Sequence, residues 1–175
     1  PEILYELTKR GWPSHKVPCK QYGHRIERLT HTLKGMGLLK NKHVPPAYLT
    51  ASCEQRLDLL RGLMDTDGCC AVDGESSFSN MNLGLATAVY ILAASLGLKP
   101  TRGEYDAKLY EKITGRVHLV RWTSTLPVFL LPKKRDRLPR QTRSTQRYRY
   151  IVNCERVEDA PVRCIEVNSP SHLFL

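Results

Sequence analysis

The feature that most constrains this chain is an apolar segment between Ser52 and Gly68 that ends in two aspartates. Its apolar residues recur at helical spacing on two adjoining sides, which predicts a helix buried between its own domain and a neighbour. These residues are Cys53, Leu57, Leu60 and Met64, with Leu59 and Leu63 beside them. Ser52 is a suitable N-cap, and Gly68 can turn the chain at the other end. Gly62, in the middle, lowers helix stability, and a close approach by another helix would justify it.

The two aspartates, Asp65 and Asp67, lie where a helix carries partial negative charge. Carboxylates there are unfavourable by a few tenths to about 1 kcal/mol each, so a positive group is expected nearby. One interpretation is a helix stop with solvated carboxylates. A calcium-binding EF-hand loop fails on spacing, because Cys70 and Ser76 stand where that loop needs glycine and glutamate. A glycosidase pair is weakly disfavoured by the basic charge of the chain, and a magnesium site for phosphodiester hydrolysis fits better.

The 175-residue chain carries a net charge of +10, which favours a polyanionic partner such as DNA or RNA. Much of this charge lies in residues 133–149, where eight lysines and arginines accompany one aspartate. A solvated linker is the alternative interpretation of this tract. No apolar run reaches the length of a membrane span, and the first residues lack a signal-peptide pattern, so a cytoplasmic protein is predicted. The six cysteines lack zinc-site spacing and are expected to be free thiols.

Hydrophobic periodicity and turn residues predict an α+β fold. The expected elements are an amphipathic helix at 24–39, a break at Pro45-Pro46, the helix at 52–67, strands about a turn at Asp73-Gly74, a helix at 83–98, strands at 99–110 and 116–124 joined near Thr114-Gly115, and a short helix or turn at 125–131. From residue 52 this order is αββαββα, an antiparallel sheet with helices on one face. Beyond the basic tract, residues 149–159 and 162–169 alternate like strands.

Four blocks of the sequence, in order, resemble those of a known family. "LLRGLMDTDG" looks like the second LAGLIDADG motif of the two-motif homing endonucleases embedded in inteins. "KHVPPAYL" is similar to the block that precedes this motif, and "LAASLGL" is similar to the helix block that follows it. "PVRCIEVNSPSHLFL" resembles the penultimate splicing block of inteins.

The resemblance implies that two LAGLIDADG helices pack against each other, which would account for the second apolar side and for Gly62. It implies that Asp67 binds Mg²⁺ at the paired helix ends and is catalytic, whereas Asp65 has a structural role. The family also has a basic residue near the metal. In this chain that place is "LLPKKR", which favours Lys134, with Lys133 as the alternate.

The strands of such a domain bind the DNA target, with phosphate contacts for affinity and base contacts for sequence choice. The residues expected to face DNA are Lys99, Arg102, Lys108, Arg116, His118 and Arg121, together with Lys133. Which of them point toward DNA depends on strand register, which the sequence leaves open. A solvent-exposed surface role is the alternative for each.

The resemblance to the splicing block implies two further catalytic residues. Cys164 occupies the position where some inteins place the cysteine that forms a branched thioester, and a thiolate is a competent acyl acceptor. His172 matches the histidine that helps the terminal asparagine to cyclise. The alternatives are a buried strand cysteine and a histidine packed at a strand end.

The predicted organisation has four parts: the end of a first endonuclease repeat with a connecting segment at 1–50, a second LAGLIDADG repeat at 51–134, a basic linker at 135–146, and an incomplete C-terminal part of a Hint-type intein splicing domain at 147–175. The parent is expected to be a bifunctional intein that combines a metal-dependent double-strand DNA homing endonuclease with autocatalytic protein splicing. Its expected partners are the double-stranded DNA target, the first LAGLIDADG repeat or a second copy, and the flanking host segments.

This chain alone is expected to be inactive, since it holds one metal-binding aspartate and lacks the terminal His-Asn. Two alternatives to the bifunctional intein remain open for the parent. One is a non-cleaving DNA-binding regulator on the LAGLIDADG scaffold, and the other is a splicing-only intein with a decayed endonuclease.

Overall fold

A computed structural model describes residues 2–18, 20, 23–141, 148–168 and 170. Five short elements come first: α1 (Glu2–Lys9), β1 (Ser14–Lys16), β2 (His24–Ile26), α2 (Leu29–Gly35) and α3 (Pro46–Leu49). The helix predicted over 24–39 is wrong in its first part, because residues 24–26 pair with β1 as an antiparallel strand. Arg28 then has a φ of 59°, through which a right-handed helix cannot continue. The predicted break at the two prolines is confirmed, and Pro46 opens α3.

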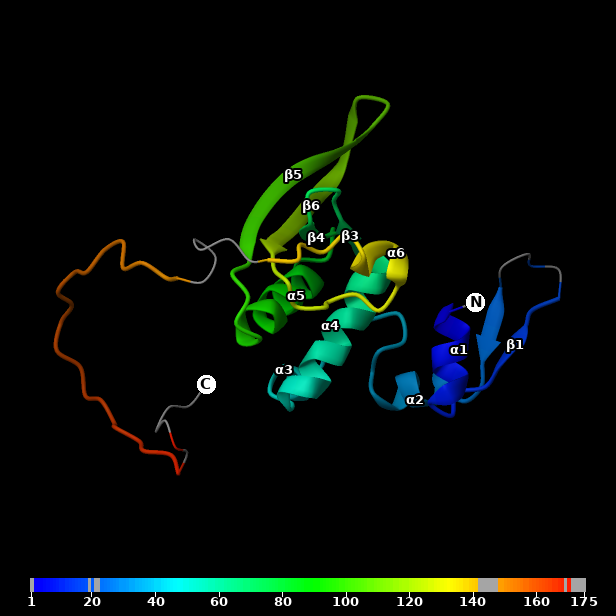
Figure 1. Cartoon of the computed structure of the whole chain (residues 1–175), viewed down its shortest axis with the longest axis horizontal. Helices are drawn as coiled ribbons and strands as arrows, with labels where there is room; N and C mark the ends of the chain where they lie inside the picture. Colours follow the sequence, from blue (N-terminus) through cyan, green and yellow to red (C-terminus); the bar gives the residue numbers. More distant parts are fainter. Residues whose placement is uncertain (1, 19, 21–22, 142–147, 169, 171–175) are drawn as a thin grey trace.

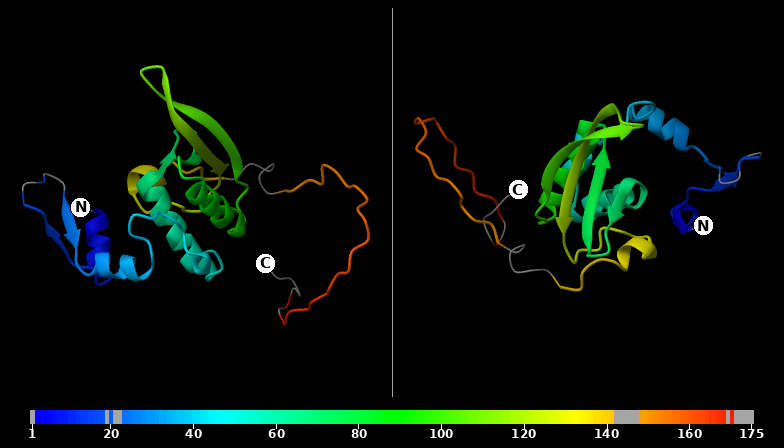
Figure 2. Two further views of the ribbon diagram at one scale, coloured as in Figure 1. Left: turned by 180° about the vertical axis from the view of Figure 1, so that it is seen from behind. Right: turned by 90° about the horizontal axis from the view of Figure 1, so that it is seen from above.

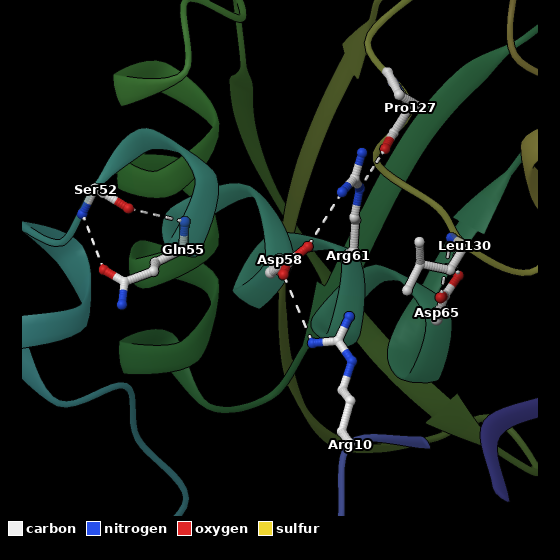
Figure 3. Close-up of polar contacts among 8 residues, drawn as sticks. All are labelled: Arg10, Ser52, Gln55, Asp58, Arg61, Asp65, Pro127 and Leu130. Atoms are coloured by element: carbon white, nitrogen blue, oxygen red, sulfur yellow. Dashed lines mark hydrogen bonds and ion pairs between the residues drawn. The ribbon is translucent and has the colours of Figure 1, made fainter. Parts of the chain in front are cut away.

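The central helix α4 (Cys53–Asp67) begins as the sequence predicts. The Ser52 hydroxyl accepts from the Gln55 backbone N–H, and the Gln55 side chain accepts from the Ser52 N–H, forming a capping box (Figure 3). The prediction of a glycine turn at Gly68 is wrong. Its backbone is extended, with φ −84° and ψ 164°, and it opens strand β3. Glycine is needed there for space, because a Cβ would lie 2.7 Å from the Met64 carbonyl oxygen.

One antiparallel sheet forms the body of the domain, in the order β3-β4-β6-β5. Its strands are β3 (Gly68–Cys70), β4 (Glu75–Asn80), β5 (Thr101–Leu109) and β6 (Lys112–Thr123). Helices α4 and α5 (Leu83–Ser95) lie on the same side of this sheet (Figures 1 and 2). The core forms between them, where Phe78, Val120 and Trp122 of the sheet pack against Leu60 and Leu92 of the helices.

The hairpin that joins β5 and β6 projects from the domain (Figure 1). Its turn is formed by Tyr110 and Glu111, with φ of 47° and 63°, and not by the predicted Thr114-Gly115. Two successive left-handed residues match the turn that suits the twist of paired strands, although glycine or asparagine usually occupies it. The sequence therefore gave no turn signal at the true position. A register shift at Ala107/Lys108 interrupts the pairing near the tip.

The segment after β6 is held against the domain. The short helix or turn predicted at 125–131 is a non-helical loop, whose Val128 and Phe129 are buried, and helix α6 (Pro132–Arg135) follows it. Leu138 packs against the core, and the Arg137 guanidinium donates to the Cys70 carbonyl at 3.0 Å. The packed unit thus includes residues that the sequence assigns to the basic linker.

The C-terminal segment differs from the strands predicted for it. Its described residues, 148–168 and 170, contain no strand and are almost all exposed. A strand needs a neighbouring backbone to satisfy its N–H and C=O groups, and no such pairing exists for the described part of this segment. It contacts the domain where Arg149 donates to the Leu98 carbonyl at 2.8 Å and Lys99 donates to the Tyr148 carbonyl at 3.2 Å.

None of the described helices is long and apolar enough to cross a membrane.

Candidate functional site

Asp65 anchors the loop before α6 to the end of α4. Its carboxylate accepts hydrogen bonds from the backbone N–H of Leu130, at 3.0 and 3.2 Å, and from that of Leu131, at 3.2 Å (Figure 3). Charge-assisted bonds of this kind are about twice as strong as neutral ones. The carboxylate that looked unfavourable at a helix end is thus stabilised by hydrogen bonds from two backbone donors.

Lys134 brings positive charge to the same helix end. Its Nζ donates to the carbonyl oxygens of Met64, Asp65 and Gly68, at 3.0, 2.7 and 2.7 Å. The last turn of α4 contains no basic residue of its own, so this ammonium from α6 faces the negative end of the helix dipole. Lys133, the predicted alternate, is exposed. The positive group that the sequence requires near the aspartates is therefore Lys134.

Asp67 has a different environment. It is the last residue of α4, it is exposed, and within the described chain its carboxylate makes no hydrogen bond or ion pair. The described residues contain no cluster of three or more His, Cys, Asp or Glu side chains that could hold a metal ion. At this end of α4, Asp67 is therefore a carboxylate whose oxygens have no partner among the described residues.

The outer face of α4 borders a groove of about 740 Å³ between α1, α4 and the 130–135 segment. Gly62 lies in this groove, and a side chain there would meet no atom within 4 Å, so the described chain does not supply the close approach that the sequence predicts. Arg10, the residue after α1, pairs with Asp58 at 3.6 Å. Asp58 also accepts from Arg61, whose Nε donates to the Pro127 carbonyl at 2.9 Å (Figure 3).

Strand register divides the sheet residues between a helix-covered face and an open face. The open face includes four cross-strand rows: Glu75 with Thr123; Ser77, Arg121 and Thr101; Ser79, Leu119 and Gly103; and Val117 with Tyr105, of which Val117 is only 8% exposed. The rows between them carry the buried Trp122, Val120 and Phe78 and therefore face the helices. Because successive side chains point to opposite faces, this assignment follows for every paired position away from the register shift.

The predicted DNA-binding residues are divided by these faces. Arg121 lies on the open face, where its guanidinium is 3.9 Å from Glu75. Arg102, Arg116 and His118 lie on the helix-covered face.

Each of those three has a partner within the chain. Arg102 stacks on the Tyr90 ring at 3.9 Å from the centroid. Arg116 pairs with Glu104 at 3.2 Å and with Asp106 at 3.5 Å. The His118 ring lies 3.0 Å from Glu104. The bonds from His118 and Arg116 lower the pKa of the Glu104 carboxyl.

The remaining predicted residues are dispersed. Lys108 is exposed beyond the register shift, and Lys99 precedes β5 and bonds to Tyr148. Cys164 is an exposed free thiol in the C-terminal segment, and His172 lies outside the described residues. The structure thus brings Lys134 and Asp67 to the same end of α4. The C-terminal segment leaves the domain on the side of α5, away from α6 (Figure 1).

Sequence reasoning missed the residues that join the 127–137 segment to the rest of the domain. Arg61 and Arg137 were not singled out, and no local pattern marks them, because their partners are backbone carbonyls 66 and 67 residues away. It also missed Ser77 and Tyr105 of the open face. Strand alternation groups them with Arg121, and that grouping was available once the register was known.

Comparison with known proteins agrees with this geometry. Residues 54–127 match the family described as the LAGLIDADG-like domain, and this segment runs from the first turn of α4 to the loop after β6. This segment therefore resembles a LAGLIDADG-like domain. Over 155 residues it is also 35% identical to a protein described as replicative DNA helicase DnaB from Mycobacterium intracellulare. That alignment covers 86% of this chain but only 27% of the helicase protein.

Proposed function

We propose that this chain is part of a bifunctional intein, in which a site-specific DNA endonuclease is inserted in a self-splicing domain. The observation that carries the nuclease half is the LAGLIDADG-like domain whose central helix ends on an exposed, unpaired Asp67. A protein that only binds DNA has no need of a metal-binding carboxylate at this position. The net charge of +10 favours a polyanionic substrate.

In this proposal double-stranded DNA lies on the open face of the sheet, on the side away from α4 and α5. Arg121 supplies positive charge there, and Ser77, Ser79 and Tyr105 supply hydroxyl groups that can meet phosphates or base edges. Arg102, Arg116 and His118 act within the protein, because each already has an aromatic or acidic partner on the helix-covered face. Their contribution to DNA binding is therefore indirect.

Asp67 would bind Mg²⁺ together with a second carboxylate from a paired LAGLIDADG helix. The metal, when bound, supplies Lewis-acid polarisation of the scissile phosphodiester. The paired helix comes from the first repeat of the parent or from a second copy, and the exposed Gly62 groove of α4 is the surface available for it. Because this chain supplies one metal-binding carboxylate, that of Asp67, we expect that it does not cut both DNA strands alone.

The splicing half of the proposal rests on the C-terminal block and on the helicase relative. Cys164, an exposed free thiol, acts as the acyl acceptor that forms a branched intermediate, and His172 assists cyclisation of the terminal asparagine. The relative is named as a replicative DNA helicase, and the chain covers 27% of it, which suits an element carried within a nucleic-acid-processing host. The flanking host segments are then the partners that become ligated.

The nuclease proposal is tested by cleavage of the insertion site with the complete parent and Mg²⁺. Asp67→Asn is expected to lower cleavage by at least about 100-fold, because it removes a metal-binding carboxylate. Asp136→Asn, an exposed change of the same charge, is the matched control. Equal cleavage by the wild type and Asp67→Asn would refute the assignment. Specific binding without cleavage or magnesium dependence would favour the DNA-binding regulator instead.

The splicing proposal is tested by intact-mass spectrometry of the parent expressed in cells. Ligated host protein and a separate excised piece are expected from the wild type. Cys164→Ala should abolish ligation, whereas Cys154→Ala, at another exposed cysteine of the same segment, should not. Unaltered ligation by Cys164→Ala would remove that residue from the mechanism. Splicing without DNA cleavage would identify a decayed endonuclease.

A further inference from the structure

We infer that Lys134 is a positioning residue, which holds the end of α4 and thereby sets the backbone of Asp67. This inference deepens the proposed function, since it changes how the basic residue near the metal would act. The family resemblance suggests a lysine that takes part in the reaction directly. The contacts of Lys134 in this chain point to an indirect role through the helix end.

The first step of the argument is the use of the ammonium protons. A lysine ammonium has three N–H donors, and Nζ of Lys134 lies 2.7 to 3.0 Å from three backbone carbonyl oxygens. All its donors therefore have partners within the protein. To contact a phosphate or transfer a proton, the ammonium would have to give up one of these bonds to the backbone at the end of α4.

The second step is the placement of the three acceptors. Met64 and Asp65 precede Asp67, and Gly68 follows it, so the bonds hold the backbone on both sides of the candidate metal-binding residue. The Gly68 N–H also donates to the Met64 carbonyl, which closes the last turn. Because its side chain makes no hydrogen bond or ion pair within the described chain, Asp67 depends on this backbone for the direction of its carboxylate.

The third step is the anchoring of Lys134 itself. Its half-buried side chain leaves the short helix α6, and its backbone N–H donates to the Leu131 carbonyl at 3.0 Å. The Leu131 N–H in turn donates to the Asp65 carboxylate. Asp65 and Lys134 thus form a closed set of contacts, in which α4 binds the α6 segment and α6 binds the end of α4. Neighbouring Lys133 is exposed and takes no part in that set.

The inference is tested first without DNA or metal, by amide hydrogen exchange of the full 175-residue chain. Lys134→Met retains the length of the side chain and removes all three donors. We expect the amides of Asp67 and Gly68 to exchange about tenfold faster or more, with β6 unchanged. Lys133→Met is the matched control and should leave these amides as in the wild type. Equal exchange in the two variants would overturn the inference.

A second measurement keeps the test valid if Lys134→Met fails to fold. In the wild-type chain at neutral pH, a lysine ammonium with three protein acceptors exchanges its protons slowly with water. Nitrogen-15 NMR should therefore detect a Lys134 ammonium signal, while the exposed Lys133 gives none. The absence of a Lys134 signal under conditions that reveal other bonded lysines would contradict the bonding on which the inference rests.

Kinetics of the complete parent separate positioning from direct catalysis. Lys134→Met should lower kcat and raise the Mg²⁺ concentration for half-maximal cleavage, leave the KM for DNA within about twofold, and keep the shape of the pH profile. Loss of one limb of that profile would show that Lys134 transfers a proton and refute the inference. If the wild-type parent does not cut DNA, the proposed function fails while the exchange result still decides the role of Lys134.

Discussion

The two faces of the sheet are built from the same strands but serve different purposes. On the helix-covered face, Phe78, Val120 and Trp122 are at most 3% exposed and belong to the core. Their immediate neighbours on the strands, which include Ser77, Ser79 and Arg121, lie on the open face, and Ser79 and Arg121 are exposed. Two residues next to each other on a strand can therefore differ completely in role: one is buried in the core, and the other lies on a surface available for binding.

The comparison also applies to charged residues. Arg116 and Arg121 lie five positions apart on β6, and both are exposed. Arg116 pairs closely with Glu104 and Asp106, whereas Arg121 approaches Glu75 only at 3.9 Å. Exposure alone therefore does not identify a binding residue. The face on which a side chain lies and the strength of its pairing are both needed.

The largest effect is expected for the core of the helix-covered face. Phe78→Ala removes a fully buried aromatic ring and should lower the free energy of unfolding by about 3–5 kcal/mol. The adjacent open-face change Ser77→Ala should stay within about 0.5 kcal/mol. Urea denaturation followed by circular dichroism measures both. Similar losses from the two changes would mean that the open face is also packed in solution.

Cys69 and Cys70, which are adjacent on β3, provide a chemical test of the difference between the open face and the covered face. Cys69 is exposed and pairs with Ser77 of the open face, while Cys70 is 1% exposed and pairs with Ser76 of the covered face. Burial is the main cause that raises the pKa of the Cys70 thiol, so less of the reactive thiolate forms there.

Iodoacetamide at pH 8 should therefore alkylate Cys69 about 100-fold faster than Cys70, because Cys70 must also wait for local opening. Comparing Cys69→Ser with Cys70→Ser by peptide mass spectrometry isolates each thiol. Exposed Cys53 provides the reference rate. Comparable alkylation at both positions would show that β3 opens readily and that the faces are not separate there.

Arg121→Ala tests whether DNA binds to the open face of the sheet or to the covered face. If the open face binds the duplex in the complete parent, this change should weaken binding by up to about tenfold and reduce the slope of log K against log salt by about one. Arg116→Ala, which removes an arginine paired on the covered face, should leave that slope unchanged. Fluorescence anisotropy across a salt series measures both slopes. Equal changes for the two arginines would contradict the assignment of DNA to the open face.

The sequence predicted helix α4 and the β3-β4 turn well because their signals are local. The Ser52 cap and the Asp73-Gly74 turn depend on residues within a few positions. The β5-β6 turn was misplaced because Tyr110 and Glu111 adopt left-handed backbone without glycine. The C-terminal strands were predicted from alternation alone, and alternation forms a strand only where a partner backbone is present.

For the candidate site, the types of residue were easier to predict from the sequence than the hydrogen bonds that these residues make. The sequence required a positive group near Asp65 and Asp67, and it named Lys134 only through a family resemblance. It could not show that Lys134 binds three carbonyls or that Asp65 binds the Leu130 and Leu131 amides, because these partners lie more than 60 residues apart. Such contacts depend on tertiary packing and leave no short-range pattern in the sequence.

The smallest effect is expected on the covered face at Glu104, whose bonds to His118 and Arg116 lower its pKa from the usual 4.5. Because the folded chain holds the carboxylate more readily than the unfolded chain, this group stabilises the fold above the unfolded pKa. That contribution is lost as the pH falls through the lower folded pKa. Glu104→Gln should therefore be less stable than the wild type at pH 6, and the difference should shrink progressively below pH 4.5. Urea midpoints of the two proteins, measured across this pH range, test the prediction. A difference between the midpoints that stays constant with pH would show that the charge of Glu104 makes no net contribution to stability.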